Sequence, residues 1–292
     1  MNTHSITWLN GQLLPTSQAT VPVNDHGLLY GDGVFEGIRI YRRRAFRLQK
    51  HLQRLALSAR AIALEIPLSS DELTAVIEQL IDAFPDDDGY IRLMVTRGEG
   101  PLGLNPKSCT QANIIAIADQ LTMIAIDELQ AGARLMVSSV RRLSADGLDP
   151  RIKSLNYLNH ILAKIEANHA GADEAILLNA QGRVAEGTAD NIFIVRNGRL
   201  LTPPCSEGAL EGITRELVLQ LGQADGIETS EQPLGVYDLY AADECFLTGT
   251  GAELIAVASI DCRSLPSCPG PVFQRLQQAF RRTIDQECGG IA

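Results

Sequence analysis

Strand-like and helix-like segments do not alternate regularly along this chain of 292 residues, and that irregular order is the strongest constraint on its fold. A doubly wound parallel sheet needs one helix after nearly every strand, whereas here several strand-like segments follow one another before the next helix. Apolar residues recur at helical spacing in residues 51–64, 71–84, 155–169, 214–222 and 272–284. Strands are expected in a hairpin at 6–14 and at 33–41, 45–48, 90–96, 113–118, 133–140, 174–178, 183–186, 191–195, 244–248 and 253–260. The order predicts an α+β fold, with Ser70 as the cap of the helix at 71–84.

The length is close to the size at which one hydrophobic core divides into two. We place the division in an interdomain linker at residues 123–132, between a smaller α+β domain, residues 1–122, and a larger α+β domain, residues 133–292.

Charge and composition limit the kinds of partner. Lysine and arginine number 25 against 35 aspartate and glutamate residues, so the formal net charge is −10, and such a chain repels the phosphate backbone of nucleic acids. No apolar run approaches the roughly 18 residues that span a bilayer, and the first residues do not resemble a signal peptide. The 6 cysteines are scattered without a C-x-x-C pair. We therefore expect a cytoplasmic protein with reduced cysteines, no metal site, no nucleic-acid partner and no membrane partner.

One motif is misleading. Residues 98–103 match the dinucleotide pattern G-x-G-x-x-G after a strand, but Pro106 breaks the helix that such a site needs directly after its glycines. We interpret this segment as a turn or an active-site loop.

Two other glycine-containing segments are candidate phosphate sites. Residues 212–214, Gly-Ile-Thr, open a helix, where free backbone N–H groups and the helix dipole attract anions. Residues 248–251, Thr-Gly-Thr-Gly, follow a strand and let a ligand approach the backbone closely. Taken alone, the first segment is more often a plain helix cap and the second a plain turn, and Lys153 and Glu186 are usually surface charges.

The order of the motifs changes this interpretation. Residues 152–158, 186–192, 210–215 and 247–253 follow residues 30–39 and 51–55. In this order and spacing they resemble the class IV (fold-type IV) pyridoxal-phosphate (PLP) aminotransferases, and among these the branched-chain amino acid aminotransferases, from about residue 6 to residue 262. The resemblance implies the two-domain fold of the D-amino acid aminotransferase-like proteins, with residues 133–292 as the cofactor-binding domain and PLP at the domain interface.

The resemblance also implies roles for single residues. Lys153 matches the lysine that bonds to the cofactor aldehyde and then moves the α-proton, Glu186 the carboxylate beside the pyridine nitrogen, and Tyr157 the hydroxyl near the ring oxygen. The residues that match the ring face and the phosphate site are Arg54, Leu210, Gly212, Ile213, Thr214, Gly249 and Thr250.

These residue types suit that chemistry. A buried lysine beside a cationic cofactor can have its pKa lowered enough to act as a nucleophile and base. A carboxylate keeps the ring nitrogen protonated, so the ring withdraws electrons from the substrate. The phosphate dianion needs a cation and N–H donors, which Arg54 and the helix start at Thr214 supply in an otherwise acidic chain.

Substrate residues must be sought outside this shared set, because the scaffold serves several reactions. Tyr90 and Arg92 are two residues apart on a strand and therefore share a face. They resemble the Tyr-x-Arg of branched-chain aminotransferases, which accepts both an apolar side chain and the distal carboxylate of glutamate. Phe35, expected to line an apolar pocket, and Gly37, expected to leave room, are also of that type. The expected substrate set is completed by Tyr30, Thr250, Gly251 and Ala252.

The resemblance implies transfer of the amino group of a branched-chain L-amino acid to 2-oxoglutarate, giving a 2-oxo acid and glutamate, in branched-chain amino acid biosynthesis. D-amino acid aminotransferase and aminodeoxychorismate lyase are the alternatives on this scaffold, and an idle cofactor-binding protein is the alternative outside the enzymes. The Arg-x-His carboxylate trap of the D-specific enzymes is replaced by Leu102-Gly103-Leu104. The resemblance further implies a homodimer or higher homo-oligomer, in which the loop at residues 99–105 closes the neighbouring subunit's pocket.

Overall fold

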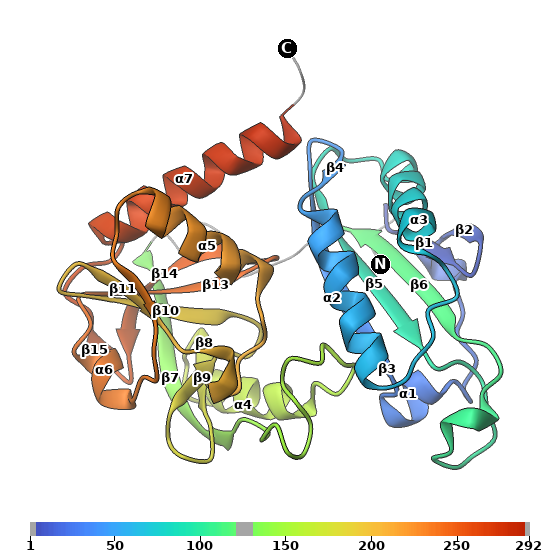
Figure 1. Ribbon diagram of the computed structural model, residues 1–292, viewed down its shortest axis with the longest axis horizontal. Helices are drawn as coiled ribbons and strands as arrows, with labels where there is room; N and C mark the ends of the chain where they lie inside the picture. The colour runs from blue at the N-terminus through green and yellow to red at the C-terminus, as the bar shows by residue number, and fades with distance from the viewer. Residues whose placement is uncertain (1–3, 121–130, 290–292) are drawn as a thin grey trace. The chain divides into compact units, whose positions relative to one another are not determined.

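The computed structural model describes residues 4–120 and 131–289 (Figure 1). Its contacts divide the chain into two compact units. The first comprises Met1–Leu121, Ile152–Asn156 and Ile284–Ala292, and the second comprises Thr122–Arg151 and Tyr157–Thr283. The linker predicted at 123–132 lies mostly outside the described residues, so the boundary placed there stays a prediction.

The first unit is built on a six-stranded antiparallel sheet in the order β2-β1-β6-β5-β3-β4. Its strands are β1 (Ile6–Leu9), β2 (Gln12–Pro15), β3 (Gly33–Tyr41), β4 (Arg44–Ala45), β5 (Gly89–Thr96) and β6 (Asn113–Asp119). Its helices are α1 (His26–Tyr30), α2 (Leu48–Ala61) and α3 (Ser70–Ala83), with single 3-10 turns η1 (Thr16–Gln18) and η2 (Pro106–Ser108).

Strand alternation decides which face of this sheet is a core and which carries function. Ile38 of β3 and Ile91 of β5 are fully buried, and they belong to one hydrophobic cluster with Leu55 of α2 and Leu80 of α3. Helices α2 and α3 therefore cover this face (Figure 1). Alternate residues of the same strands must point to the opposite face, and these include the predicted substrate residues Phe35, Gly37, Tyr90 and Arg92.

The starts of two helices differ from the sequence prediction. Ser69, not Ser70, caps α3: its hydroxyl accepts from the N–H of Glu72, and the Glu72 carboxylate accepts from the Ser69 N–H. This reciprocal capping box supplies two terminal N–H groups with partners. The strand expected at 45–48 is only Arg44–Ala45, because Arg47 adopts a left-handed conformation with φ 55° and α2 begins directly after it.

The second unit contains a nine-stranded mixed sheet in the order β12-β11-β10-β13-β14-β7-β8-β9, with β15 paired to β14. Its strands are β7 (Ala133–Arg141), β8 (Glu174–Leu178), β9 (Val184–Glu186), β10 (Asn191–Arg196), β11 (Arg199–Thr202), β12 (Thr229–Glu231), β13 (Glu244–Gly249), β14 (Glu253–Ile260) and β15 (Arg263–Ser264). Its helices are α4 (Leu158–His169), α5 (Ile213–Ala224), α6 (Val236–Tyr240) and α7 (Pro271–Cys288), and η4 (Cys205–Glu207) is a 3-10 turn. The stacked rings of Phe193 and Phe246, with centroids 5.2 Å apart, mark the core between β10 and β13.

Helix α4 starts later than its apolar periodicity suggests. It was expected from residue 155, but it begins at Leu158. The preceding segment pairs with the first unit instead: Ser154 forms a β-bridge with Val34, and the Leu155 N–H donates to the Gly33 carbonyl at 3.0 Å. The backbone of residues 152–156 is thus held in an extended pairing beside β3.

Within residues 4–120 and 131–289, no helix is both long and apolar enough to cross a membrane. Across the same residues, no group of three or more histidine, cysteine, aspartate or glutamate side chains is arranged to hold a metal ion.

Candidate active site

Lys153 lies in the first unit, with its backbone fixed on both sides. Its N–H donates to the Ser58 hydroxyl at 3.1 Å, and its carbonyl accepts from the Phe35 N–H at 3.0 Å. Its Nζ lies 4.5 Å from the centroid of the Phe35 ring. The helix α2 and the strand β3 therefore place this amine beside an aromatic face.

Tyr90 and Arg92 share the face of the sheet that carries Phe35. In the register of β3 and β5, Gly37 is opposite Arg92 and Phe35 is opposite Met94. The Arg92 guanidinium carbon lies 4.4 Å from the centroid of Phe35 and 5.7 Å from that of Tyr90. Burial raises the pKa of Tyr90, so its hydroxyl is protonated at neutral pH and able to donate a hydrogen bond. An apolar ring and a guanidinium are thus presented side by side.

Gly37 leaves room, but for a neighbour in the same sheet. A Cβ atom built at this position would lie 1.7 Å from the Tyr90 Oη and 2.6 Å from its Cζ. The absence of a side chain at Gly37 is therefore what allows the Tyr90 ring to lie across β3.

A buried carboxylate faces α2 from β3. Both oxygens of Glu36 accept from Arg54, with Nε to Oε1 at 2.7 Å and Nη2 to Oε2 at 2.8 Å. Oε2 also lies 2.7 Å from the His51 Nδ1. Burial alone would raise the pKa of Glu36, but the charge and hydrogen bonds of Arg54, with the hydrogen bond from His51, lower that pKa to about 2. Arg54 was predicted as a phosphate ligand, whereas Glu36 and His51 were missed.

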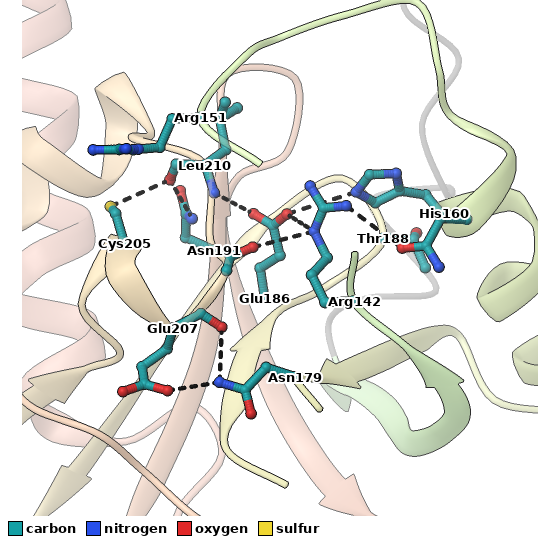
Figure 2. A network of polar contacts seen from close by, with 12 residues as sticks. Arg142, Arg151, His160, Asn179, Glu186, Thr188, Asn191, Cys205, Glu207 and Leu210 are labelled. Atoms are coloured by element: carbon teal, nitrogen blue, oxygen red, sulfur yellow. Dashed lines mark hydrogen bonds and ion pairs between the residues drawn. The ribbon is translucent and has the colours of Figure 1, made fainter. Parts of the chain in front are cut away.

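In the second unit, Glu186 is the centre of a network of polar contacts (Figure 2). The Arg142 Nε donates to its Oε1 at 3.0 Å, and the Leu210 N–H donates to its Oε2 at 2.8 Å. The His160 Nε2 lies 3.6 Å from Oε1. Burial alone would raise the pKa of Glu186, but the contact with His160 and the charge of Arg142 outweigh it and lower the pKa. Glu186 is therefore ionised at neutral pH, as a partner for a protonated ring nitrogen must be.

Tyr157 is connected to this network through His160. The two rings are stacked, with centroids 4.5 Å apart and an interplanar angle of 23°. The Nδ1 atom of His160 is buried and has no hydrogen-bond partner in the described part of the chain. Neither His160 nor Arg142 was found from the sequence.

The start of α5 has the features of an anion site. Gly212 is the N-cap and supplies no side chain to the N–H groups of Ile213 and Thr214. A Cβ at Gly212 would lie 1.9 Å from the Asn191 Oδ1, and Asn191 is paired across the sheet with Thr248. The Thr248 Oγ1 is buried without a hydrogen-bond partner among the described residues. Uncapped N–H groups, a glycine that leaves the backbone open and an unsatisfied hydroxyl fit a phosphate group.

The other predicted residues have different surroundings. Gly249 ends β13, where a Cβ would lie 2.3 Å from the Asp190 Oδ1, and Thr250, Gly251 and Ala252 form the turn that leads into β14. Tyr30 is the last residue of α1, and its hydroxyl accepts from the Gly103 N–H at 2.9 Å. The segment 98–103 is a loop followed by a 3-10 turn, as expected for a sequence that is not a dinucleotide site.

Comparison with known proteins identifies the family. The model of the amino-transferase class IV family matches residues 33–260. The chain is 48% identical over 275 residues to a putative branched-chain-amino-acid aminotransferase of Methanocaldococcus jannaschii, with 94% of each chain covered. The chain belongs to the class IV aminotransferases.

Solved structures agree with this assignment. The branched-chain aminotransferase of Thermoproteus uzoniensis, solved with norvaline, has a TM-score of 0.89 and 38% identity, covering 96% of this chain and 94% of that one. The branched-chain amino acid aminotransferase of Thermobaculum terrenum, solved in its PLP form, has a TM-score of 0.86 and 33% identity, covering 96% of this chain and 93% of that one. The predicted family and α+β fold are confirmed, and the protein is an aminotransferase whose cofactor is PLP.

Proposed function

We propose that the protein transfers the amino group of a branched-chain L-amino acid to 2-oxoglutarate, giving a 2-oxo acid and glutamate. The observation that carries this proposal is the contact between Arg92 and Phe35, with the guanidinium carbon 4.4 Å from the ring centroid. An enzyme that alternates between leucine-like and glutamate-like substrates must bind an apolar side chain and a carboxylate in turn. The same sheet face offers an aromatic ring for the first and a cation for the second.

We assign a separate role in the proposed reaction to each of the site residues. Bound PLP supplies an electrophilic aldehyde and an electron-withdrawing ring. Lys153 would hold the cofactor through its Nζ, and the same Nζ would be the base that removes and later returns the proton of the substrate α-carbon. Glu186 would keep the ring nitrogen protonated, and the start of α5 and Arg54 would each bind the phosphate. The backbone of Lys153 is hydrogen-bonded to both Ser58 and Phe35. This supports the role of Lys153, because a catalytic base must be held in a fixed position relative to the proton that it removes.

An assay of the purified protein with L-leucine, D-alanine and aminodeoxychorismate tests the substrate class. We expect glutamate to form only with L-leucine and 2-oxoglutarate. Turnover of D-alanine alone would favour a D-amino acid aminotransferase, and pyruvate release from aminodeoxychorismate would favour the lyase. Lys153→Ala should abolish turnover and the absorbance band that arises from the bond between the lysine and the cofactor aldehyde, and a variant that retained both would contradict the assignment of the lysine.

Arg92→Met separates the two kinds of substrate. The loss of a charged hydrogen-bond donor weakens binding by about 1.5–3 kcal/mol, or roughly 10- to 100-fold. We expect the KM for 2-oxoglutarate to rise by this factor, while the KM for L-leucine changes little because Phe35 remains. Equal increases in both KM values would show that Arg92 does not discriminate between them.

We also propose that the protein is a homodimer or a higher homo-oligomer. The apolar stripe of α4 does not face its own core: Leu158, Ile161, Leu162 and Ile165 are between 43% and 67% exposed. The covered face of α4 carries Ala163 and Ala167 instead. A contiguous apolar stripe on a helix surface is typical of a protein–protein contact. Ile161→Asp should lower the mass measured by light scattering, while Leu57→Asp, at an isolated leucine that is 57% exposed on α2, serves as the control.

The loop at residues 99–105 is our candidate for closing the neighbouring subunit's substrate pocket. Leu102 and Leu104 are 83% and 82% exposed, yet the loop backbone is tied down. The Pro101 carbonyl lies 3.0 Å from the His26 Nε2, and the Gly103 N–H donates to Tyr30. A fixed loop that carries exposed leucines is suited to contact an apolar surface of another chain.

We place the protein in the cytoplasm and in branched-chain amino acid biosynthesis. All 6 cysteines are free thiols, which fits a reducing compartment. Run from 2-oxo acid to amino acid, the proposed reaction is the amination step that such a synthesis needs.

A further inference from the structure

Glu36 is a buried carboxylate on the apolar face of β3. It lies two residues from both Val34 and Ile38 along β3, so its side chain shares their face, which α2 and α3 cover. The Glu36 side chain is fully buried there. Transfer of an ionised carboxylate into such a face is strongly unfavourable unless it is paired and hydrogen-bonded. Glu36 is paired with Arg54, whose side chain is 12% exposed, through two short hydrogen bonds.

The geometry of this pair fixes one edge of the guanidinium. Glu36 binds the Nε and Nη2 atoms, and such a bidentate contact sets both the plane and the direction of the group. Glu36 thus engages two of the five N–H donors that a guanidinium carries. Burial lowers the pKa of His51, so the neutral imidazole donates its Nδ1–H to Glu36 and holds the carboxylate from another side.

The helix that carries Arg54 also contacts the segment that carries Lys153. One helical turn along α2, the hydroxyl of Ser58 accepts from the backbone N–H of Lys153. The buried face of this helix thus connects the Glu36–Arg54 pair to the segment that carries Lys153.

Charge alone does not explain how Arg54 could bind an anion. The paired carboxylate cancels its positive charge, so a point-charge attraction for a phosphate dianion largely disappears. What remains is directional hydrogen bonding, and that depends on how accurately the guanidinium is aimed.

We propose that Glu36 is the positioning residue for the cofactor phosphate: held between Arg54 and His51, it aims the Arg54 guanidinium at the phosphate group. This inference rests on the proposed role of Arg54 in the phosphate site. Glu36 then acts on the phosphate of the cofactor and not on its ring.

Binding of two noncovalent cofactor forms tests this. Pyridoxamine 5′-phosphate and pyridoxamine differ only in the phosphate and have no aldehyde, so neither bonds to Lys153. Their Kd values for the full-length apoprotein are measured by calorimetry, and the ratio isolates the phosphate contribution. In Glu36→Gln an amide NH₂ faces the guanidinium N–H groups. We expect the Kd for pyridoxamine 5′-phosphate to rise about 10- to 100-fold, as when an orienting partner is removed from a metal ligand, with pyridoxamine unchanged.

Asp25→Asn is the matched control. Asp25 is also a fully buried carboxylate of the first unit, and its side chain accepts from Gly27, Thr96 and Asn113. It should leave the ratio of the two Kd values unchanged. An equal change in Asp25→Asn and Glu36→Gln would show general loosening of the unit and would overturn the proposal.

Arg54→Gln separates failure of this inference from failure of the proposed phosphate site. If Arg54→Gln leaves the ratio unchanged, Arg54 is not a phosphate ligand and both ideas are wrong. If Arg54→Gln lowers phosphate selectivity but Glu36→Gln does not, only the positioning role is wrong. In the double variant, Glu36→Gln should add nothing to Arg54→Gln, because Glu36 acts through Arg54. Should Glu36→Gln fail to fold by circular dichroism, Glu36→Asp gives the same test, because it retains the charge and shortens the reach.

Discussion

The pair formed by Arg142 and Glu186 allows a sharp prediction for stability. Arg142→Met keeps most of the side-chain volume but leaves the Glu186 carboxylate buried without its principal cation. The two side chains are only 7% and 6% exposed, and the Arg142 Nε also donates to the Gly208 carbonyl at 3.1 Å. Removal of one partner of such a buried pair costs about 3–5 kcal/mol. The apoprotein should therefore be markedly less stable at pH 7.

The assay is thermal unfolding of the apoprotein, followed by calorimetry. A loss of 1 kcal/mol shifts Tm by about 2–4 °C in a domain of this size, so we expect a decrease of about 6–20 °C. Arg134→Met is the matched control, because Arg134 pairs with Asp173 at 3.0 Å but is 62% exposed. A pair of that kind contributes at most about 1 kcal/mol.

A double variant tests whether an unpaired buried charge causes the destabilisation of Arg142→Met. If the destabilisation comes from an unpaired buried charge, then Arg142→Met/Glu186→Gln should be more stable than Arg142→Met alone, because the charge has been removed. The reasoning is refuted if Arg142→Met lowers Tm no more than Arg134→Met, or if the double variant is the less stable one.

Three further outcomes follow from the structure. The pKa of Glu36 is lowered from 4.5 to about 2. The difference in free energy of unfolding between wild type and Glu36→Gln should therefore be full above pH 4.5 and shrink as the pH falls towards 2. Equal differences in urea unfolding at about pH 6 and about pH 3 would contradict this. Ser69→Ala should cost about 1 kcal/mol in guanidinium chloride and Ser70→Ala clearly less, because only Ser69 caps α3. In Gly212→Ala, a Cβ 1.9 Å from the Asn191 Oδ1 should displace the start of α5 and weaken pyridoxamine 5′-phosphate binding about tenfold or more by calorimetry, whereas unchanged affinity would remove this helix start from the phosphate site.

The sequence predicted the long periodic elements well and the short ones poorly. Helices α2, α3, α5 and α7 lie close to their expected ranges because several turns of apolar spacing define each of them. Helices α1 and α6 have 5 residues each, too few to show a period, and they were missed. For α4 the period was recognised, but periodicity cannot show that the larger apolar side chains point away from the core.

Prediction of the candidate site followed a similar division. Lys153, Glu186 and the α5 start could be identified because the order of local motifs carries that information, although their roles stay predictions. The side chains that support them could not be identified, because their contacts join positions that are distant in the sequence. Glu36 is hydrogen-bonded to Arg54, 18 residues further along the chain, and Arg142 to Glu186, 44 residues further along. One signal was available for Glu36, since an acidic residue between buried positions of a strand requires a cationic partner.

The extended pairing of residues 152–156 beside β3 has a consequence for how this protein can be divided. A gene fragment that ends near residue 122 would encode the six strands of the first sheet but omit the segment that bridges to Val34 and bears Lys153. The complementary fragment would carry that segment away from its hydrogen-bonding partners. Exchange of contiguous halves between relatives would therefore pair each lysine with a foreign strand, so chimeras that keep both units whole need four crossovers, at about residues 121, 151, 156 and 283, rather than one.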